Sequence, residues 1–85
     1  MNSKRDNFSL LQALGRAIQE RRLKLNLSQK ELAEEAGVDR AYISNIEQAK
    51  RNPSLGAMRS LALGLRTRLS KLIGNAERIE NDANS

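Results

Sequence analysis

The stretch LSQKELAEEAGVDRAYISNIE, residues 27–47, has the pattern of two short amphipathic helices separated by a glycine. Ser28 and Glu31 have the spacing of a capping box, in which each side chain bonds the other residue's backbone N–H at the start of a helix. Gly37 can adopt the positive φ that commonly follows a helix, because it has no Cβ. The first of the two helices is therefore predicted over residues 29–36.

The second helix of this stretch is predicted over residues 40–48, with Asp39 as its N-cap. Ile43 and Ile46 are the two residues of this helix that suit burial. The remainder of its surface is polar or small, so the helix is expected to turn one face away from the core.

The spacing of residues favours a helix-turn-helix over an ordinary helical hairpin. Ala33 falls where the two helices would cross, and a larger side chain there would push them apart. Gly37 supplies the turn between them. The apolar residues that would clamp the pair onto the rest of the domain are Leu32, Val38, Ile43 and Ile46.

Apolar residues at helical spacing predict three further helices. Ser9 and Gln12 have capping-box spacing at the start of a helix over 9–24, which Asn26 can end. Ser54 caps a fourth helix from Leu55 to Leu65. A short fifth helix follows at 69–76. The expected fold is an all-α, compact five-helix domain, with a flexible N-terminus at 1–8, the helix-turn-helix domain and its dimerising C-terminal helices at 9–76, and a polar tail at 77–85.

Composition narrows the classes of function. The 85 residues, 39% of them hydrophobic, are enough for one domain with one core. The chain has no histidine and no cysteine, and Ser, Asp, Glu and Lys show no activating arrangement, so no enzyme activity, metal site or cofactor is expected. No apolar run approaches the roughly 20 residues of a membrane span, and the first ten residues lack the apolar stretch of a signal peptide. A cytoplasmic protein without membrane contact is therefore expected.

The charge balance points to a phosphate-rich partner. Fifteen Lys and Arg residues against ten Asp and Glu give a formal net charge of +5, which attracts phosphate. An aromatic content of 2% argues against the stacking platforms that hold unpaired bases. Double-stranded DNA is thus favoured over single-stranded nucleic acid.

The outward face of helix 40–48 holds the candidate base-contacting residues. Arg40 can donate two N–H groups to guanine, and the amide of Asn45 suits adenine. Ala41 can pack on a thymine methyl. A phosphate contact or a solvated helix start is the alternative for Arg40. The candidates are Arg40, Ala41, Ser44 and Asn45, with Tyr42 open between DNA contact and packing beside the core.

Phosphate contacts are predicted at two places beside that helix. The N-terminus of helix 29–36 offers free N–H groups and the positive end of the helix dipole. The basic loop after residue 48 would meet the backbone that flanks the groove, although an ordinary polar connector is the alternative. The predicted phosphate-contacting residues are Ser28, Gln29, Lys50, Arg51 and Asn52.

Glu47 does not fit a DNA-facing surface, because phosphate repels a carboxylate. One turn after Ile43, it is expected to face the first helix, where Arg22 is available for a structural ion pair. Two unrelated surface charges are the alternative.

The segment LSQKELAEEAGVDRAYISNIEQAKRNPS resembles the Cro and repressor type (XRE-like) helix-turn-helix of phage regulators, and within it DRAYISNIE and KRNPS most resemble the controller proteins of restriction-modification systems. The resemblance covers about residues 9–75 and is strongest over 27–54. It implies a lambda-repressor-like domain that binds operator duplex as a dimer, with helix 40–48 in the major groove. It also implies that Tyr42 reaches DNA and that Arg22 pairs with Glu47. Ala41 departs from the hydroxyl or other polar side chain frequent in controller proteins.

Two copies of the chain are expected to act together, because one helix discriminates too few base pairs, whereas a dimer reads two half-sites. The apolar stripes of the last two helices are wider than one small core needs; covering the monomer core alone is the alternative. The expected partners are operator DNA, a second copy of the chain, two dimers per operator and RNA polymerase. The predicted interface residues are Leu55, Met58, Leu65, Leu69, Leu72 and Ile73.

The functional hypothesis is a sequence-specific transcriptional regulator, acting as repressor or activator, in the manner of a controller protein. A prophage repressor or antitoxin-type regulator uses the same motif and is the first alternative. The second alternative is a protein-docking helical module without DNA binding, which would use the fourth helix or the acidic tail.

Overall fold

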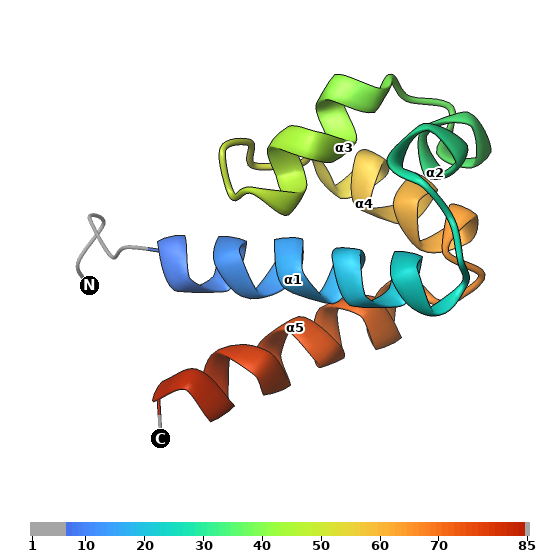
Figure 1. Ribbon diagram of the computed structural model, residues 1–85. Helices are drawn as coiled ribbons and strands as arrows, with labels where there is room; N and C mark the ends of the chain where they lie inside the picture. The colour runs from blue at the N-terminus through green and yellow to red at the C-terminus, as the bar shows by residue number, and fades with distance from the viewer. Residues whose placement is uncertain (1–6, 85) are drawn as a thin grey trace.

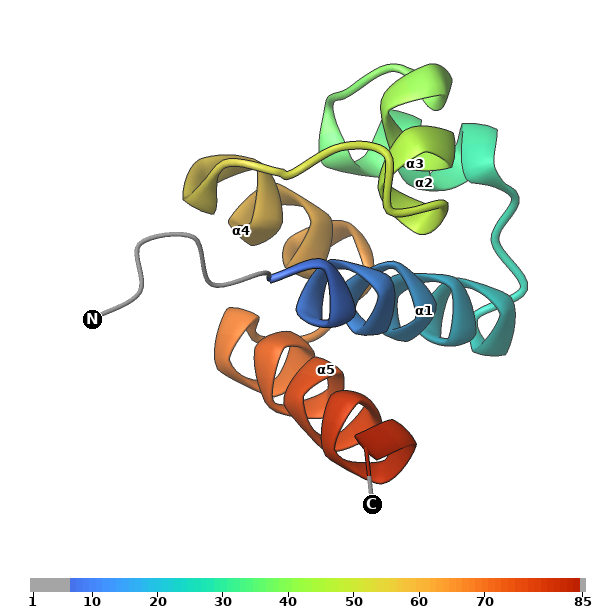
Figure 2. The same cartoon turned by 90° about the vertical axis from the view of Figure 1, so that its left-hand side faces the viewer.

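The computed structural model describes residues 7–84, and over that range it contains five helices and no strand (Figure 1). Helix α1 passes through the middle of the molecule. Helices α2, α3 and α4 lie on one side of it, and α5 lies along the other (Figures 1 and 2). The predicted all-α fold is confirmed. The helices are α1 (Phe8–Lys24), α2 (Gln29–Ala36), α3 (Arg40–Glu47), α4 (Leu55–Gly64) and α5 (Leu69–Asn84).

One hydrophobic core lies between the five helices and fixes the position and orientation of α3. Ala33 is 4% exposed, and its small side chain allows α2 and α3 to pack closely, as its position in the sequence predicted. Every helix contributes at least one side chain to the core, so α3 is tied to the whole domain. The largest fully buried side chains are Ile18, Leu32, Ile43, Ile46, Leu61, Leu65 and Leu72.

The predicted start signals of α2, α3 and α4 are present as hydrogen bonds. Ser28 Oγ accepts from the backbone N–H of Glu31 at 3.0 Å, and the Glu31 carboxylate accepts from the backbone N–H of Ser28 at 2.9 Å. Asp39 and Ser54 cap α3 and α4 in the same way with their side-chain oxygens. These caps satisfy N–H groups that the first turn of a helix leaves without a partner.

Helix α2 also ends as predicted, with Gly37 as the residue after it. Gly37 has φ of +72°, and the N–H of Val38 donates to the carbonyl of Ala33 at 3.0 Å. This is the hydrogen-bond pattern of a helix that ends in a left-handed residue. The turn into α3 is therefore set by the glycine.

Helix α1 begins differently from its prediction. It starts at Phe8, and its N-cap Asn7 makes no side-chain capping bond. Ser9, predicted as the capping residue, lies in the first turn and donates its hydroxyl to Glu80 Oε2 at 2.6 Å. The predicted flexible segment 1–8 lies outside the described residues except for Asn7 and Phe8.

Helix α5 is longer than predicted. It continues to Asn84, whereas the sequence suggested a helix over 69–76 followed by a polar tail. Ala76 is 1% exposed, and Ile79 packs against the core one turn later. Packing on α1, together with the Ser9–Glu80 hydrogen bond, continues the helix through the mostly polar segment from residue 77 onwards. Among residues 7–84, no helix combines the length and apolarity needed to cross a bilayer.

Candidate nucleic-acid interface

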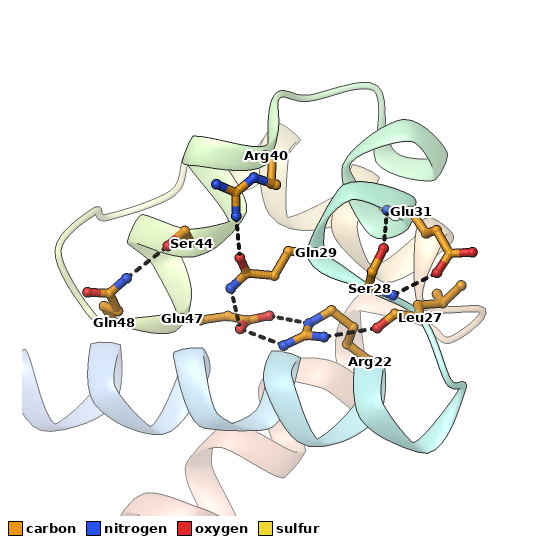
Figure 3. Close-up of polar contacts among 9 residues, drawn as sticks. All are labelled: Arg22, Leu27, Ser28, Gln29, Glu31, Arg40, Ser44, Glu47 and Gln48. Carbon is orange, nitrogen blue, oxygen red and sulfur yellow. Dashed lines mark hydrogen bonds and ion pairs between the residues drawn. The ribbon is translucent and has the colours of Figure 1, made fainter.

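Helix α3 is buried on one side and open on the other. Ile43 and Ile46 are 0% and 1% exposed, whereas Arg40, Ala41 and Asn45 are exposed. Ser44, the fourth predicted base-contacting residue, is half-buried. Arg40 and Ser44 both project from α3 on the side turned away from α4 (Figure 3). The helix therefore offers a polar surface of the kind that enters the major groove.

The predicted pair of Arg22 and Glu47 joins α1 to the last residue of α3. Arg22 Nε lies 2.7 Å from Glu47 Oε2, and Arg22 Nη2 lies 3.0 Å from Oε1. The two side chains are 9% and 2% exposed. Arg22 also donates to the carbonyl of Leu27 at 2.9 Å, so the same guanidinium fixes the turn before α2. Because this ion pair is bidentate and buried, it fixes the position of α3 relative to α1.

Gln29, predicted as a phosphate-contacting residue, joins this pair to the exposed surface. Its Nε2 donates to Glu47 Oε1 at 3.1 Å, and its Oε1 accepts from Arg40 Nη1 at 3.2 Å (Figure 3). Four side chains from three helices thus form one chain of hydrogen bonds, from the buried Arg22 to the exposed Arg40. One N–H of the Gln29 amide remains outside these bonds, so the prediction of a phosphate contact still stands as a prediction.

Gln48 belongs to the candidate site, although it was not among the predicted DNA-contacting residues. It is exposed, and its Nε2 donates to Ser44 Oγ at 2.8 Å. Since the Ser44 oxygen accepts this bond, its hydroxyl hydrogen is left to donate to a base or phosphate acceptor. The available signal was the spacing of four residues, which places two side chains on the same face of a helix.

Tyr42 packs beside the core, which was one of its two predicted positions. It is half-buried against core residues, and Arg51 Cζ lies 5.2 Å from the centre of its ring. This cation–π contact connects α3 to the basic loop that follows it. Lys50, Arg51 and Asn52 are all exposed in that loop, so the predicted phosphate contacts are sterically open.

The capping box limits how Ser28 could contact phosphate. Its backbone N–H donates to the Glu31 carboxylate and its Oγ accepts from the backbone N–H of Glu31, so both groups are already engaged within the capping box. The hydrogen bond from the Ser28 backbone N–H, followed by that with the Ser28 side chain, lowers the pKa of Glu31 below its ordinary value. Glu31 is therefore a carboxylate at neutral pH, and its charge opposes a phosphate at the start of α2.

Two of the six residues predicted for the dimer interface are buried inside the domain. Leu65 and Leu72 are 0% and 1% exposed, because they fill the core between α4, α5 and α1. Leu55 is 66% exposed. Met58, Leu69 and Ile73 are half-buried. Of the six predicted residues, the four that remain available to a pairing surface on α4 and α5 are therefore Leu55, Met58, Leu69 and Ile73.

Within residues 7–84, no three Asp, Glu, His or Cys side chains lie together in a group that could hold a metal ion. The described side chains also leave no buried polar nitrogen or oxygen without a hydrogen-bond partner. The polar groups available to a ligand in the described part of the chain are thus on its surface.

The helix-turn-helix family matches residues 18–72, which is more than half of the chain. Control protein C.MunI from a Mycoplasma species is 40% identical over 58 residues, covering 68% of this chain and 78% of that protein. The immunity repressor protein of Bacillus phage phi105 is 32% identical over 69 residues. That match covers 81% of this chain, and the chain spans about half, 48%, of the length of that repressor.

Solved structures of controller proteins share the fold. The restriction-modification controller protein C.AhdI from Aeromonas hydrophila superposes with a TM-score of 0.72 at 35% identity, covering 73% of this chain and 94% of that one. The controller protein C.Esp1396I, a tetramer bound to its natural 35 base-pair operator, superposes with a TM-score of 0.78 at 27% identity. That match covers 84% of this chain and 93% of the other. With a helix-turn-helix held by a buried ion pair, this chain belongs to the helix-turn-helix family and is similar to the controller proteins of restriction-modification systems.

Proposed function

We propose that this chain is a sequence-specific regulator that binds double-stranded operator DNA as a homodimer and acts as the controller protein of a restriction-modification system. The observation that carries the proposal is α3, whose apolar side is fully buried and whose polar side is open. The likeness to C.MunI over most of both chains supports the narrower assignment. The proposed activity is binding, without catalysis, in the cytoplasm.

The proposed DNA contacts fall into two groups. Arg40, Ala41, Ser44 and Asn45 would meet base edges, with Tyr42 at the edge of this set, because they lie along one side of α3. Contacts at the other sites would fix the register of the protein on DNA without reading sequence. These proposed phosphate contacts are Ser28, Gln29, Lys50, Arg51 and Asn52.

The proposed dimer uses the apolar surface at α4 and α5. Leu55, at 66% exposure, has a large apolar side chain in solvent at the start of α4. Met58, Leu69 and Ile73 would complete the surface. The tetramer of C.Esp1396I on its operator supports pairing of dimers as well. We also propose that the protein contacts RNA polymerase when it acts as an activator.

A phage repressor is the second candidate function, and the likeness to the phi105 immunity repressor supports it. Both candidates read duplex DNA with α3, and the genes beside the binding site separate them. A protein-docking module without DNA binding differs from both, because it would show no preferred duplex.

The experiment compares Arg40→Ala with Lys50→Ala on a selected duplex and on a panel in which each base pair is changed in turn. Arg40→Ala is expected to weaken binding to the selected site by about 1–3 kcal/mol and to remove the preference at one base pair. Lys50→Ala is expected to weaken binding to all sequences alike and to reduce the slope of log K against log salt by about 1. Equal losses on every duplex for both variants would overturn the assignment of roles.

A further inference from the structure

Arg21 of α1 reaches across to the turn that joins α4 to α5. Its Nε donates to the carbonyl oxygen of Leu65 at 2.9 Å, and its Nη2 donates to the carbonyl oxygen of Arg66 at 3.1 Å. Carbonyl groups at the C-terminal end of a helix lack partners within the helix, and a cation placed there also interacts favourably with the helix dipole. One guanidinium therefore closes the end of α4 and ties the following turn to α1.

The backbone of this turn has an unusual conformation. Arg66 has φ of +56°, and the N–H of Thr67 donates to the carbonyl of Ala62 at 2.9 Å. These are the features of a helix that ends in a left-handed residue, with an arginine at the position that glycine usually occupies. A left-handed conformation is unfavourable for a residue with a Cβ. The bond that the Arg66 carbonyl accepts from Arg21 stabilises the residue in this conformation.

The direction in which α5 leaves the turn matters, because α4 and α5 belong to different parts of the fold. Helix α4 packs mainly on α2, whereas α5 packs mainly along α1 (Figure 1). The placement of α5 relative to α4 thus depends on the turn between them and on α1, which carries Arg21.

The surface proposed for dimerisation includes parts of both helices. Leu55 and Met58 lie in the first turn of α4, and Leu69 and Ile73 lie in the first two turns of α5. The starts of the two helices are on the same side of the molecule (Figure 2). A change in the angle between α4 and α5 would therefore change the shape of the pairing surface. In a two-fold dimer, such a change would also move one copy of α3 relative to the other.

We propose that Arg21 is a positioning residue for operator spacing: by holding the turn between α4 and α5, it sets the shape of the pairing surface and, through that shape, the separation of the two copies of α3. The inference rests on the proposed function, because it assumes that two copies paired through α4 and α5 read one operator. It gives Arg21 an effect on the spacing between half-sites and none on the base sequence within a half-site. Arg22, the next residue, is bonded to Glu47 and acts on the position of α3 instead.

The test measures binding to duplexes that contain the two half-sites of the selected sequence, with the spacer between them unchanged, lengthened or shortened by one base pair. Each base pair shifts a half-site by about 3.4 Å and rotates it by about 35° around the DNA axis. The unmodified protein is expected to prefer one spacer. Arg21→Met keeps the unbranched stem and removes both bonds. It is expected to lose about 3- to 10-fold of that preference, which corresponds to the loss of one or two hydrogen bonds.

Two further variants show whether the geometry of the guanidinium is responsible. Arg21→Lys keeps the positive charge but has a single nitrogen, which cannot reproduce the two-point contact, so it should also lose part of the spacer preference. Arg16→Met is the matched control. Arg16 is an exposed arginine of the same helix, and it pairs only with the exposed Glu20 among the described residues. Its replacement should leave the spacer preference unchanged.

Two other measurements separate positioning from a general loss of structure. Binding to a duplex with a single half-site reports recognition by α3 alone and should be the same in Arg21→Met and the unmodified protein. Residual dipolar couplings of backbone N–H groups report the orientation of α5 relative to α4. In Arg21→Met the couplings of α5 are expected to shrink relative to those of α4, because the angle between the helices fluctuates more. Circular dichroism checks that the variants are folded.

An unchanged spacer preference in Arg21→Met would overturn the positioning role. A loss of binding that is equal on every spacer and on the single half-site would also overturn it, since that is the pattern of a destabilised domain. Failure of the proposed function is distinct from both, because it would appear in the unmodified protein as the absence of any preferred duplex or of any dependence on spacer length.

Discussion

Gly15 of α1 lies directly against the backbone of Ile46 at the end of α3. A Cβ placed on Gly15 would be 2.5 Å from the carbonyl oxygen of Ile46 and 2.7 Å from that of Glu47. Real Cβ atoms do not approach backbone oxygens this closely, so the two helices would have to separate. Because Gly15 has no side chain, the end of α3 can lie this close to α1.

Gly15→Ala is expected to lower the free energy of unfolding by about 1–3 kcal/mol, because overpacking against backbone atoms outweighs the better helix propensity of alanine. Gly74→Ala is the control. It lies within α5, where an added Cβ meets nothing within 4 Å, and it is expected to raise the free energy of unfolding by about 0.5–1 kcal/mol. Urea denaturation measures both variants, and a stabilised Gly15 variant would contradict the close approach.

Glu47→Ala is expected to lower the free energy of unfolding by about 3–5 kcal/mol, since it leaves the guanidinium of Arg22 buried without its counter-charge. The matched control is Glu20→Ala. Glu20 pairs with Arg16 at 3.3 Å, but these side chains are 57% and 66% exposed, so the loss there is expected to stay below about 1 kcal/mol. Similar losses in the two variants would mean that burial does not distinguish the pairs.

The Glu47 carboxylate illustrates which contacts of the candidate site can be predicted from the sequence and which cannot. Arg22 and Glu47 were predictable because a carboxylate in a phosphate-facing helix has to turn elsewhere. The caps of α2 and α3 were also predictable, since they depend on residues three apart. The bonds of Gln29 to Glu47 and Arg40 were not, because they join residues 18 and 11 apart whose distance depends on the crossing of α2 and α3.

The length of α5 could not be predicted from its sequence pattern, for a different reason. Residues beyond Ala76 are mostly polar, and Ile79 is a weak apolar signal on its own. The contact of this segment with α1 decides that it is helical, and a pattern along one segment does not report that contact. Leu65 and Leu72 were misassigned for the same reason, because spacing places them on an apolar stripe without saying whether the core or a second chain covers it.

Ser28→Ala is expected to raise the pKa of Glu31 towards its ordinary value. In the unmodified protein the hydrogen bond from the Ser28 backbone N–H is the larger cause of the lowered pKa, and the bond with the side chain is the smaller one, so the shift should be reversed only in part. A lowered folded-state pKa stabilises the fold above the unfolded-state pKa, and this stability is lost as pH falls through the folded-state value. Carboxyl carbon shifts followed by NMR against pH measure the change. An unchanged pKa in the variant would remove the side chain as a cause.

Leu55→Lys is expected to weaken the proposed dimerisation at least about tenfold, because a charge would enter the proposed apolar contact surface. Leu23→Lys changes a comparably exposed leucine near the end of α1, with 57% against 66% exposure, and is expected to leave dimerisation unchanged. Sedimentation over a range of concentrations measures both. Equal effects of the two substitutions would remove α4 from the interface.

Selection of bound sites from random duplexes tests whether α3 recognises a defined DNA sequence. The recovered sequences are expected to share two symmetric half-sites about 34 Å apart, one turn of the double helix, and binding to them is expected to fall steeply as salt rises. Recovered duplexes that share no sequence, bound no more tightly than the starting pool, would contradict sequence-specific recognition by α3.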